Sequence, residues 1–141
     1  IILCASTTLT DKYGVPESPE QLIDYPGIVY TQHTQKEVWR YQTPDGKTLS
    51  QTLNRNFSTN TAEMMLEACL QGLGLALLPI FSADVHLRSG ELVALLPEYQ
   101  TYPETDIYAL YPQNAYLSTR TRLFIDWLKD TSKQFPWCET S

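Results

Sequence analysis

Apolar and polar positions are patterned most clearly in residues 58–79. Asn60 or Thr61 is expected to cap a helix that is apolar over most of its surface and is therefore largely buried. The polar residues of this helix make one narrow stripe, which consists of Glu63, Glu67 and Gln71. Gly72 ends the helix, and residues 75–78 are continuously apolar, which is typical of a strand inside a sheet. A helix, a glycine and a buried strand in this order predict an α/β unit.

Alternating residues in the first half of the chain predict a hairpin. Residues 38–41 and 48–57 are expected to be its strands, and Pro44-Asp45-Gly46 its turn, because proline fixes φ and glycine supplies a positive φ. One face of the second strand is wholly polar. The other face carries apolar residues at Leu49, Leu53 and Phe57. We therefore expect a surface hairpin with one solvated face.

The rest of the pattern predicts further short elements. Ser18 is expected to cap a helical turn, with Pro19 at the first helical position and Gln21 completing a capping box. Ser118 is expected to cap a last helix that runs to about Lys133. The apolar stripe of that helix consists of Leu117, Phe124, Trp127 and Leu128. Strands are expected at residues 3–5, 28–30, 91–95 and 107–111, a helix at 81–87, a loop at 11–16 and a linker at 97–105.

Composition fits one globular domain. The chain has 141 residues, of which 43% are apolar and 18% charged, enough for a single core. Its formal net charge of −6 disfavours a phosphate backbone, so any DNA contact is expected from a segment outside this chain. No apolar run approaches the ~18 residues that span a bilayer, so no membrane partner is expected. The first residue is not methionine and no signal-peptide pattern follows it, which favours an internal fragment.

Motifs for catalysis or metal binding are missing from the sequence. The three cysteines are widely spaced, which suits reduced thiols in a cytoplasm. His33 and His86 do not have metal-ligand spacing with any cysteine pair. Glu63 and Glu67 share a helix face, but a solvated stripe explains them better than paired-carboxylate chemistry. We therefore expect no enzyme activity, no cofactor and no metal.

The order of motifs resembles the effector-binding domain of LysR-type transcription regulators. The most specific motif is Gly72-Leu73-Gly74-Leu75-Ala76-Leu77-Leu78-Pro79. One departure is that Ser6 is followed by Thr7-Thr8-Leu9, where the family usually has a proline and then an aromatic-leucine pair. The other motifs, in order, are Cys4-Ala5-Ser6, Tyr13-Gly14-Val15-Pro16, Pro19-Glu20-Gln21-Leu22, Trp39, Asp45-Gly46, Asn60, residues 90–96, residues 107–112, Leu117-Ser118 and residues 122–128.

This resemblance implies an α/β fold like that of type II periplasmic binding proteins, with a mixed sheet flanked by helices and a ligand cleft between two lobes. Residues 1–106 would be lobe II, and residues 107–141 the returning strand and C-terminal helix of lobe I. The first half of lobe I and an N-terminal winged helix-turn-helix would lie outside the chain. The implied function is effector sensing in a cytoplasmic homo-oligomer, a dimer or tetramer, in which a bound metabolite controls DNA binding and transcription.

Two segments are candidate effector-binding sites, since ligands of open α/β sheets lie outside the carboxyl ends of strands. The first is Tyr30-Thr31-Gln32-His33, and the resemblance implies that this loop lines the effector cleft. The second is Ser58-Thr59-Asn60-Thr61, where the N–H groups of a helix start favour an anion. Capping alone would also explain Asn60 or Thr61, and His33 could be a loop residue in water. Neither segment contains lysine or arginine, so neutral donors and the helix dipole, or charge on the other lobe, would hold a small carboxylate.

Other classes of protein stay open at this point. A solute-binding protein of a transporter would share the fold, and the sequence upstream of Ile1 would separate the two by a helix-turn-helix or a signal peptide. An α/β enzyme is the third class, although no motif favours it. Without lobe I, the stripe of the last helix would be an exposed apolar patch, so we expect it to dock on another copy of the chain, by exchange of the helix.

Overall fold

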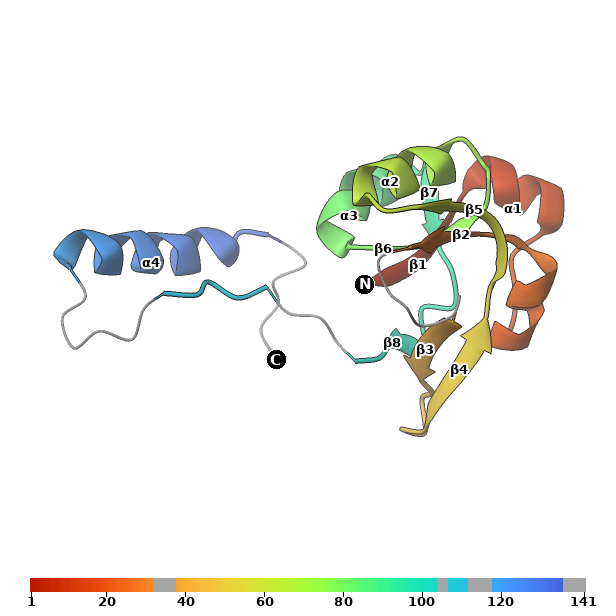
Figure 1. Cartoon of the computed structure of the whole chain (residues 1–141), viewed down its shortest axis with the longest axis horizontal. Coiled ribbons are helices and arrows are strands. Elements are labelled where there is room, and N and C mark those ends of the chain that lie inside the picture. Colours follow the sequence, from red (N-terminus) through yellow and green to blue (C-terminus); the bar gives the residue numbers. More distant parts are fainter. Residues whose placement is uncertain (32–37, 104–106, 112–117, 136–141) are drawn as a thin grey trace. The chain divides into compact units, whose positions relative to one another are not determined.

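The computed structural model describes residues 1–31, 38–103, 107–111 and 118–135. The chain forms two compact units, residues 1–105 and 106–141. The first unit is built on a five-stranded sheet in the order β5-β2-β6-β1-β7 (Figure 1). Its strands are β1 (Ile2–Ser6), β2 (Pro26–Tyr30), β5 (Asn54–Thr59), β6 (Leu75–Leu78) and β7 (Leu92–Ala94). Because β2 is parallel to β5 and β6, whereas β1 is antiparallel to β6 and β7, the sheet is mixed, as predicted.

Side chains on the two faces of this sheet enter two separate cores. Leu3 and Ala5 of β1 join one core, and Cys4 between them joins the other, because successive side chains of a strand point to opposite faces. The first core is completed by α1 (Thr7–Tyr13), the 3-10 helix η1 (Pro19–Asp24) and a small sheet in the order β4-β3-β8. The second is completed by α2 (Ala62–Leu70) and α3 (Ile80–Ser89). The strands of the small sheet are β3 (Val38–Gln42), β4 (Thr48–Thr52) and β8 (Gln100–Thr101).

The predicted helix, glycine and buried strand are confirmed as α2, Gly72 and β6. Gly72 has a φ of +74°, and the N–H of the next residue, Leu73, donates to the Ala68 carbonyl over 3.0 Å, which is a Schellman ending. Strand β6 lies in the middle of the sheet, between β2 and β1. The expected burial of α2 on most of its surface is wrong, because Met64 is 51% exposed. The helix packs on one face of the sheet only, so its outer side faces solvent.

The long second strand of the predicted hairpin is two strands. Strand β4 pairs antiparallel with β3, as predicted, but β5 leaves the hairpin and pairs parallel with β2 in the large sheet. Leu53 lies between them and is buried. The alternation of polar and apolar residues continues through both strands and no turn residue marks the change. The pattern therefore could not show that the partner strand changes at Leu53.

Two expectations near the N-terminus are corrected. Residues 11–13 belong to α1, so the loop expected from Asp11 begins only at Gly14. The buried Ser6 caps this helix by accepting the Leu9 N–H over 3.3 Å, whereas the threonines of α1 are weak helix formers that masked the signal. The turn after Ser18 is confirmed as η1, but its capping box is wrong. Ser18 makes no side-chain cap bond, and the Gln21 Oε1 accepts the Glu17 N–H instead.

Three other predicted elements are confirmed and one linker is corrected. Strand β2 confirms the strand predicted at residues 28–30, and helix α3 confirms the helix predicted at residues 81–87. Strand β7 confirms the strand predicted at residues 91–95. The linker expected at residues 97–105 contains β8, which pairs antiparallel with β3. The Trp39 indole N–H donates to the Thr101 hydroxyl over 3.1 Å and ties this strand to the first core. Strand β8 has only two residues, which is too few to produce a recognisable alternation of apolar and polar positions in the sequence.

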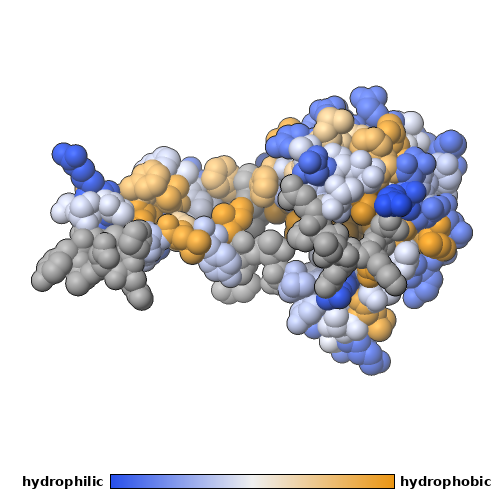
Figure 2. All heavy atoms as spheres, in the orientation of Figure 1, coloured by the Kyte–Doolittle hydropathy of each residue, from blue (hydrophilic) through white to orange (hydrophobic). Residues whose placement is uncertain are grey.

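The second unit contains α4 (Thr119–Ser132). Its predicted cap is confirmed, because the Ser118 hydroxyl accepts the Thr121 N–H over 3.2 Å. The strand predicted at residues 107–111 is not present, since none of the described strands pairs with this segment and Leu110 is 94% exposed. Phe124 and Trp127 are each 58% exposed, and apolar side chains lie along α4 in Figure 2. Leu117, from the same predicted stripe, lies outside the described residues. The assignment of the two units to lobes stays a prediction.

Candidate functional site

The two predicted binding segments meet at one edge of the large sheet. Strands β2 and β5 are parallel, and Tyr30 lies opposite Thr59 in their register. The Thr31 N–H continues the ladder by donating to the Thr59 carbonyl over 2.9 Å. Two segments that are far apart in the sequence therefore end side by side. Gln32 and His33 lie outside the described residues.

Strand β6 ends at the same edge. Ile28 of β2 lies opposite Ala76 of β6, so Tyr30, two residues on, is level with Leu78. Ile2, at the start of the antiparallel β1, also lies opposite Leu78. We call this edge, formed by the ends of β2, β5 and β6, the carboxyl edge. It is the position at which open α/β sheets bind ligands.

Helix α2 begins at the carboxyl edge, directly after β5. The Thr61 hydroxyl accepts the Met64 N–H over 3.3 Å, so the capping role expected of Asn60 or Thr61 falls to Thr61. The Thr61 N–H itself donates to the Thr59 hydroxyl over 3.3 Å. The N–H groups of Ala62 and Glu63 have no acceptor among the described residues. They are the free donors that a helix start presents to an anion.

Helix α3 begins at the same edge, directly after β6. Its cap residue is Pro79, which has no side-chain hydrogen bond to offer, and only the Pro79 carbonyl is used, by the N–H groups of Ser82 and Ala83. Two helix dipoles therefore have their positive ends at the carboxyl edge. The sequence located both helices, but it could not place the second start beside the first. That placement depends on β2, β5 and β6 being parallel.

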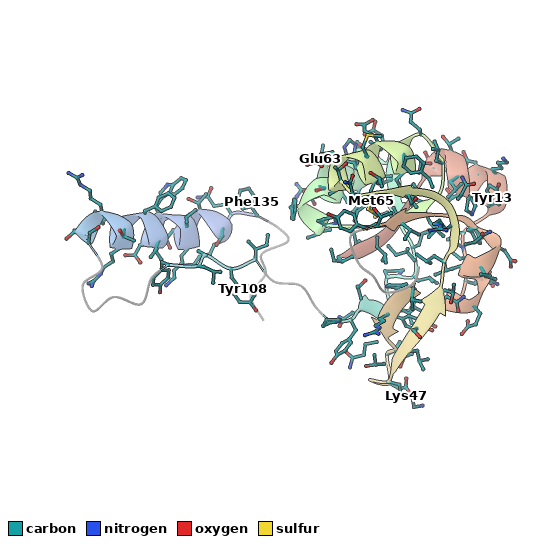
Figure 3. All side chains as sticks on the ribbon, viewed as in Figure 1. Tyr13, Lys47, Glu63, Met65, Tyr108 and Phe135 are labelled. Carbon is teal, nitrogen blue, oxygen red and sulfur yellow. The ribbon has the colours of Figure 1, made fainter. Side chains whose placement is uncertain are left out.

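Donors at the carboxyl edge are neutral. Thr31, Ser58 and Asn60 are exposed, whereas Tyr30 and Thr59 are half-buried. Residues 26–31, 58–63 and 78–81 contain no lysine or arginine, and their one charged residue is Glu63 (Figure 3). A bound carboxylate would therefore be held by hydroxyl, amide and backbone N–H groups and by the helix dipoles, against the repulsion of the exposed Glu63 carboxylate.

Reactive side chains elsewhere in the described residues do not form a catalytic arrangement. Burial raises the pKa of the Cys4 and Cys69 thiols to about 12, so both stay neutral and are poor nucleophiles. The His86 Nδ1 and the Ser89 hydroxyl both contact the Glu91 Oε2, at 2.8 Å each, so histidine and serine share one carboxylate oxygen instead of pairing with each other. No described group of three histidine, cysteine or acidic side chains could hold a metal ion.

A pocket in the first unit, at the hairpin that joins β3 to β4, lies away from the carboxyl edge. It has a volume of about 250 Å³ and is open to solvent. Lys47 marks the hairpin tip near this pocket, and Glu63 marks the start of α2, at the other end of the unit in Figure 3. The residues that line it are Gln42, Thr43, Pro44, Gly46, Glu98 and Gln100. In the described part of the chain, no helix is long and apolar enough to cross a membrane.

A mixed sheet with helices on both faces, and with two helix starts gathered at its carboxyl edge, is an arrangement in which α/β folds bind small ligands. The family model of the LysR substrate binding domain matches residues 1–133. The chain therefore belongs to the LysR substrate binding domain family, and the resemblance found in the sequence is confirmed.

Relatives and solved structures agree with this assignment. The HTH-type transcriptional regulator YhjC of Escherichia coli is 29% identical over 136 residues, which cover 96% of this chain and 45% of YhjC. The transcriptional activator AaeR of E. coli is 28% identical over 92% of this chain and 41% of its own length. The regulatory domain of AphB from Vibrio vulnificus superposes with a TM-score of 0.78 at 28% identity, over 92% of this chain and 63% of that one.

The regulatory domain of CrgA from Neisseria meningitidis gives a TM-score of 0.73 at 27% identity, also over 92% of this chain and 63% of its own. These neighbours confirm the predicted type II periplasmic-binding-protein-like fold. The chain spans less than half the length of YhjC and AaeR. Both relatives are transcription regulators, which favours the regulator over the transporter alternative.

Proposed function

We propose that the chain is the effector-sensing part of a LysR-type transcription regulator and that a small anionic metabolite binds at the carboxyl edge. The observation that carries this proposal is the meeting of Tyr30-Thr31 with Ser58-Thr59-Asn60-Thr61 beside two helix starts, in a chain of this family. Gln32 and His33 continue the first segment and belong to the proposed site. A carboxylate suits the site because its donors are neutral N–H and O–H groups.

Sensing requires two states with different affinities for the effector. The proposed cleft lies between the carboxyl edge of lobe II, residues 1–106, and a lobe I to which residues 107–141 contribute. An effector that touches both lobes favours one relative orientation of them, and only this differential affinity can change DNA binding. DNA contact would come from a winged helix-turn-helix elsewhere in the whole protein, because this chain has a formal net charge of −6. We place the whole regulator, a dimer or tetramer, in the cytoplasm with its DNA.

Binding without catalysis is part of the proposal. The relatives are transcription regulators, and the buried thiols and the shared Glu91 carboxylate leave no activated nucleophile among the described residues. The transporter alternative keeps only the fold in its favour. It would be revived by a signal peptide upstream of Ile1 in the gene.

The whole regulator provides the decisive experiment. DNA binding by the purified protein is measured by fluorescence anisotropy with a panel of small carboxylates and their uncharged amide analogues. We expect a carboxylate, and not its amide, to shift the DNA affinity, and Asn60→Ala to abolish that response without changing basal DNA binding. Gln42→Ala, at the hairpin, is the matched control and should respond normally. A response that survives Asn60→Ala and Thr31→Val together would contradict the proposed site.

The 141-residue chain alone should bind the same carboxylate weakly or not at all. It corresponds to 63% of the AphB regulatory-domain chain, so part of the proposed cleft would be contributed from outside it. Isothermal titration calorimetry with the carboxylate identified above tests this expectation. Tight, stoichiometric binding would show that one lobe is sufficient and would remove the need for a two-lobed cleft.

A further inference from the structure

Thr59 lies at the carboxyl edge, where the two predicted binding segments meet. It is the last residue of β5 and lies opposite Tyr30, the last residue of β2, in their parallel register. Thr61, the N-cap of α2, follows two residues later. Thr59 is therefore close both to the end of β2 and to the start of α2. Each of its two oxygen atoms accepts a hydrogen bond from one of these parts.

The backbone carbonyl of Thr59 holds the end of the first segment. It accepts the Thr31 N–H over 2.9 Å, one residue after β2 ends. This bond extends the pairing of β2 with β5 by one residue beyond Tyr30. The point at which Thr31 leaves the sheet is therefore fixed by Thr59.

The hydroxyl of Thr59 holds the start of the second segment. It accepts the Thr61 N–H over 3.3 Å, which closes a turn over residues 59–61 with Asn60 at its tip. Asn60 is exposed, and its side chain makes no hydrogen bond to another described residue. The position of Asn60 is therefore set by this turn and not by contacts of its own side chain.

The Thr59 hydroxyl is not needed to cap α2. Thr61 makes the cap, because its hydroxyl accepts the Met64 N–H over 3.3 Å. Thr59 is half-buried, whereas Thr31, Asn60 and Thr61 are exposed. The residue that makes both holding bonds is thus less accessible than the residues that it holds. This division is typical of one residue that fixes a geometry and neighbours that meet a ligand.

We infer that Thr59 is a positioning residue of the effector site, which holds Thr31 and Asn60 in a fixed relation to each other. This inference rests on the proposed function, because it concerns the same site. Donors that are ordered before binding hold a ligand more tightly, since the cost of ordering them is not charged to the binding step. Loss of the Thr59 hydroxyl should therefore weaken effector binding through Asn60, although the groups that meet the effector are all still present.

The response of the whole regulator tests this role. The probe is the member of a carboxylate panel, beginning with acetate, succinate and benzoate, that shifts DNA affinity in the unchanged protein. Thr59→Val keeps the β-branched shape but removes the acceptor, and it should raise the half-maximal concentration of that carboxylate about tenfold. Thr59→Ser keeps the hydroxyl and should restore the response. Gly46→Ala, which loses stability at a turn with a φ of +84°, is the control for a purely structural loss and should respond normally.

A double-mutant cycle separates positioning from direct contact. Asn60→Ser shortens the side chain that Thr59 positions. If Thr59 acts through Asn60, the double variant should weaken the response by less than the product of the two separate effects. Effects that multiply fully would show that Thr59 contacts the effector by itself and would overturn the inference. An unchanged response in Thr59→Val would also overturn it, while the proposed site would stand.

Amide exchange of the 141-residue chain tests the geometry without any ligand. Thr59→Val should accelerate exchange of the Thr61 amide about tenfold, because that amide loses its acceptor. The Thr31 amide, whose acceptor is the backbone carbonyl of Thr59, should be unaffected and serves as the internal control. A Thr61 amide that exchanges equally in both proteins would refute the role of the hydroxyl, even if no carboxylate acted on the regulator. Absence of any carboxylate response would by itself contradict the proposed function.

Discussion

Gly74 lies directly against the backbone of Pro26, at the point where the chain enters β6 beside β2. A Cβ atom on Gly74 would stand 2.5 Å from the Pro26 carbonyl oxygen and 2.9 Å from the carbonyl carbon. Both obstructing atoms belong to the backbone, so a rotamer change cannot relieve the contact. The parallel pairing of β2 with β6, which builds the carboxyl edge, depends on the absence of a side chain at this position.

Gly74→Ala should therefore destabilise the fold by about 2–3 kcal/mol, since strands β2 and β6 must separate to admit the methyl group. Gly46→Ala is the matched control. Gly46 has a φ of +84° but open space around its Cβ position, so only the backbone strain of about 1 kcal/mol is expected. Urea unfolding of both variants gives the comparison. Equal losses would show that the close approach to Pro26 does not limit this position.

Thr61→Ala should destabilise the chain by about 1 kcal/mol, because it removes the hydroxyl that accepts the Met64 N–H at the start of α2. Thr61→Ser keeps an acceptor and should cost less. Asn60→Ala should leave stability almost unchanged, since Asn60 is exposed and is not the cap. Thermal melts of the three variants test the order. A larger loss for Asn60→Ala than for Thr61→Ala would reverse the assignment of the cap.

Alkaline pH should destabilise the fold through two buried thiols. Burial raises the pKa of Cys4 and Cys69 from an ordinary value of 9.0 to about 12. The unfolded chain loses these protons above pH 9 and the folded chain retains them, so the free energy of unfolding falls as pH rises from about 9 toward 12. The slope is at most about 1.4 kcal/mol per pH unit for each thiol. Urea unfolding between pH 8 and 11 measures this slope. The Cys69→Ala variant keeps only one of the two buried thiols, so its free energy of unfolding should fall less steeply with pH.

Glu91 should titrate below its ordinary range. A hydrogen bond from the His86 side chain, and then one from Ser89, lower the pKa of the Glu91 carboxyl. The ionised form is therefore stabilised by folding at neutral pH, and this contribution disappears as pH falls through the lowered pKa. Carbon-detected NMR titration should show the pKa rising toward 4.5 in His86→Ala. Arg88→Ala should not change it, because Arg88 pairs with Asp84.

Tryptophan quenching reports on the surface of α4. Trp39 is 1% exposed and Trp127 is 58% exposed, so acrylamide should quench Trp127 and spare Trp39 at low protein concentration. If the stripe of α4 docks on another copy, the accessible emission should decrease as protein concentration rises. Subtracting the emission spectrum of the Trp127→Phe variant from that of the unchanged chain isolates the emission of Trp127. Quenching that is the same at all concentrations, together with a monomer in sedimentation, would contradict the docking expected for this stripe.

Local signals in the sequence identified most elements and several of their ends. Gly72 could be placed because only a residue with a positive φ closes a helix in this way, and Ser118 because a hydroxyl before an apolar stripe is a cap. Both depend on contacts within a few residues. The prediction of a strand at residues 107–111 is wrong because a strand depends on distant contacts and not on local ones. A strand is defined by a partner strand, and none of the described strands pairs with these residues.

The sequence by itself determined the family, the α/β class and the two candidate segments, because these depend on residue types and short spacings. Tertiary structure alone decided that Leu53 divides one apparent strand between two sheets, and that Tyr30 lies beside Thr59. It also decided that α3 starts at the same edge as α2. Each of these facts rests on which strand pairs with which and in what direction. Pairing joins residues far apart in the chain, so a periodic pattern carries no record of it.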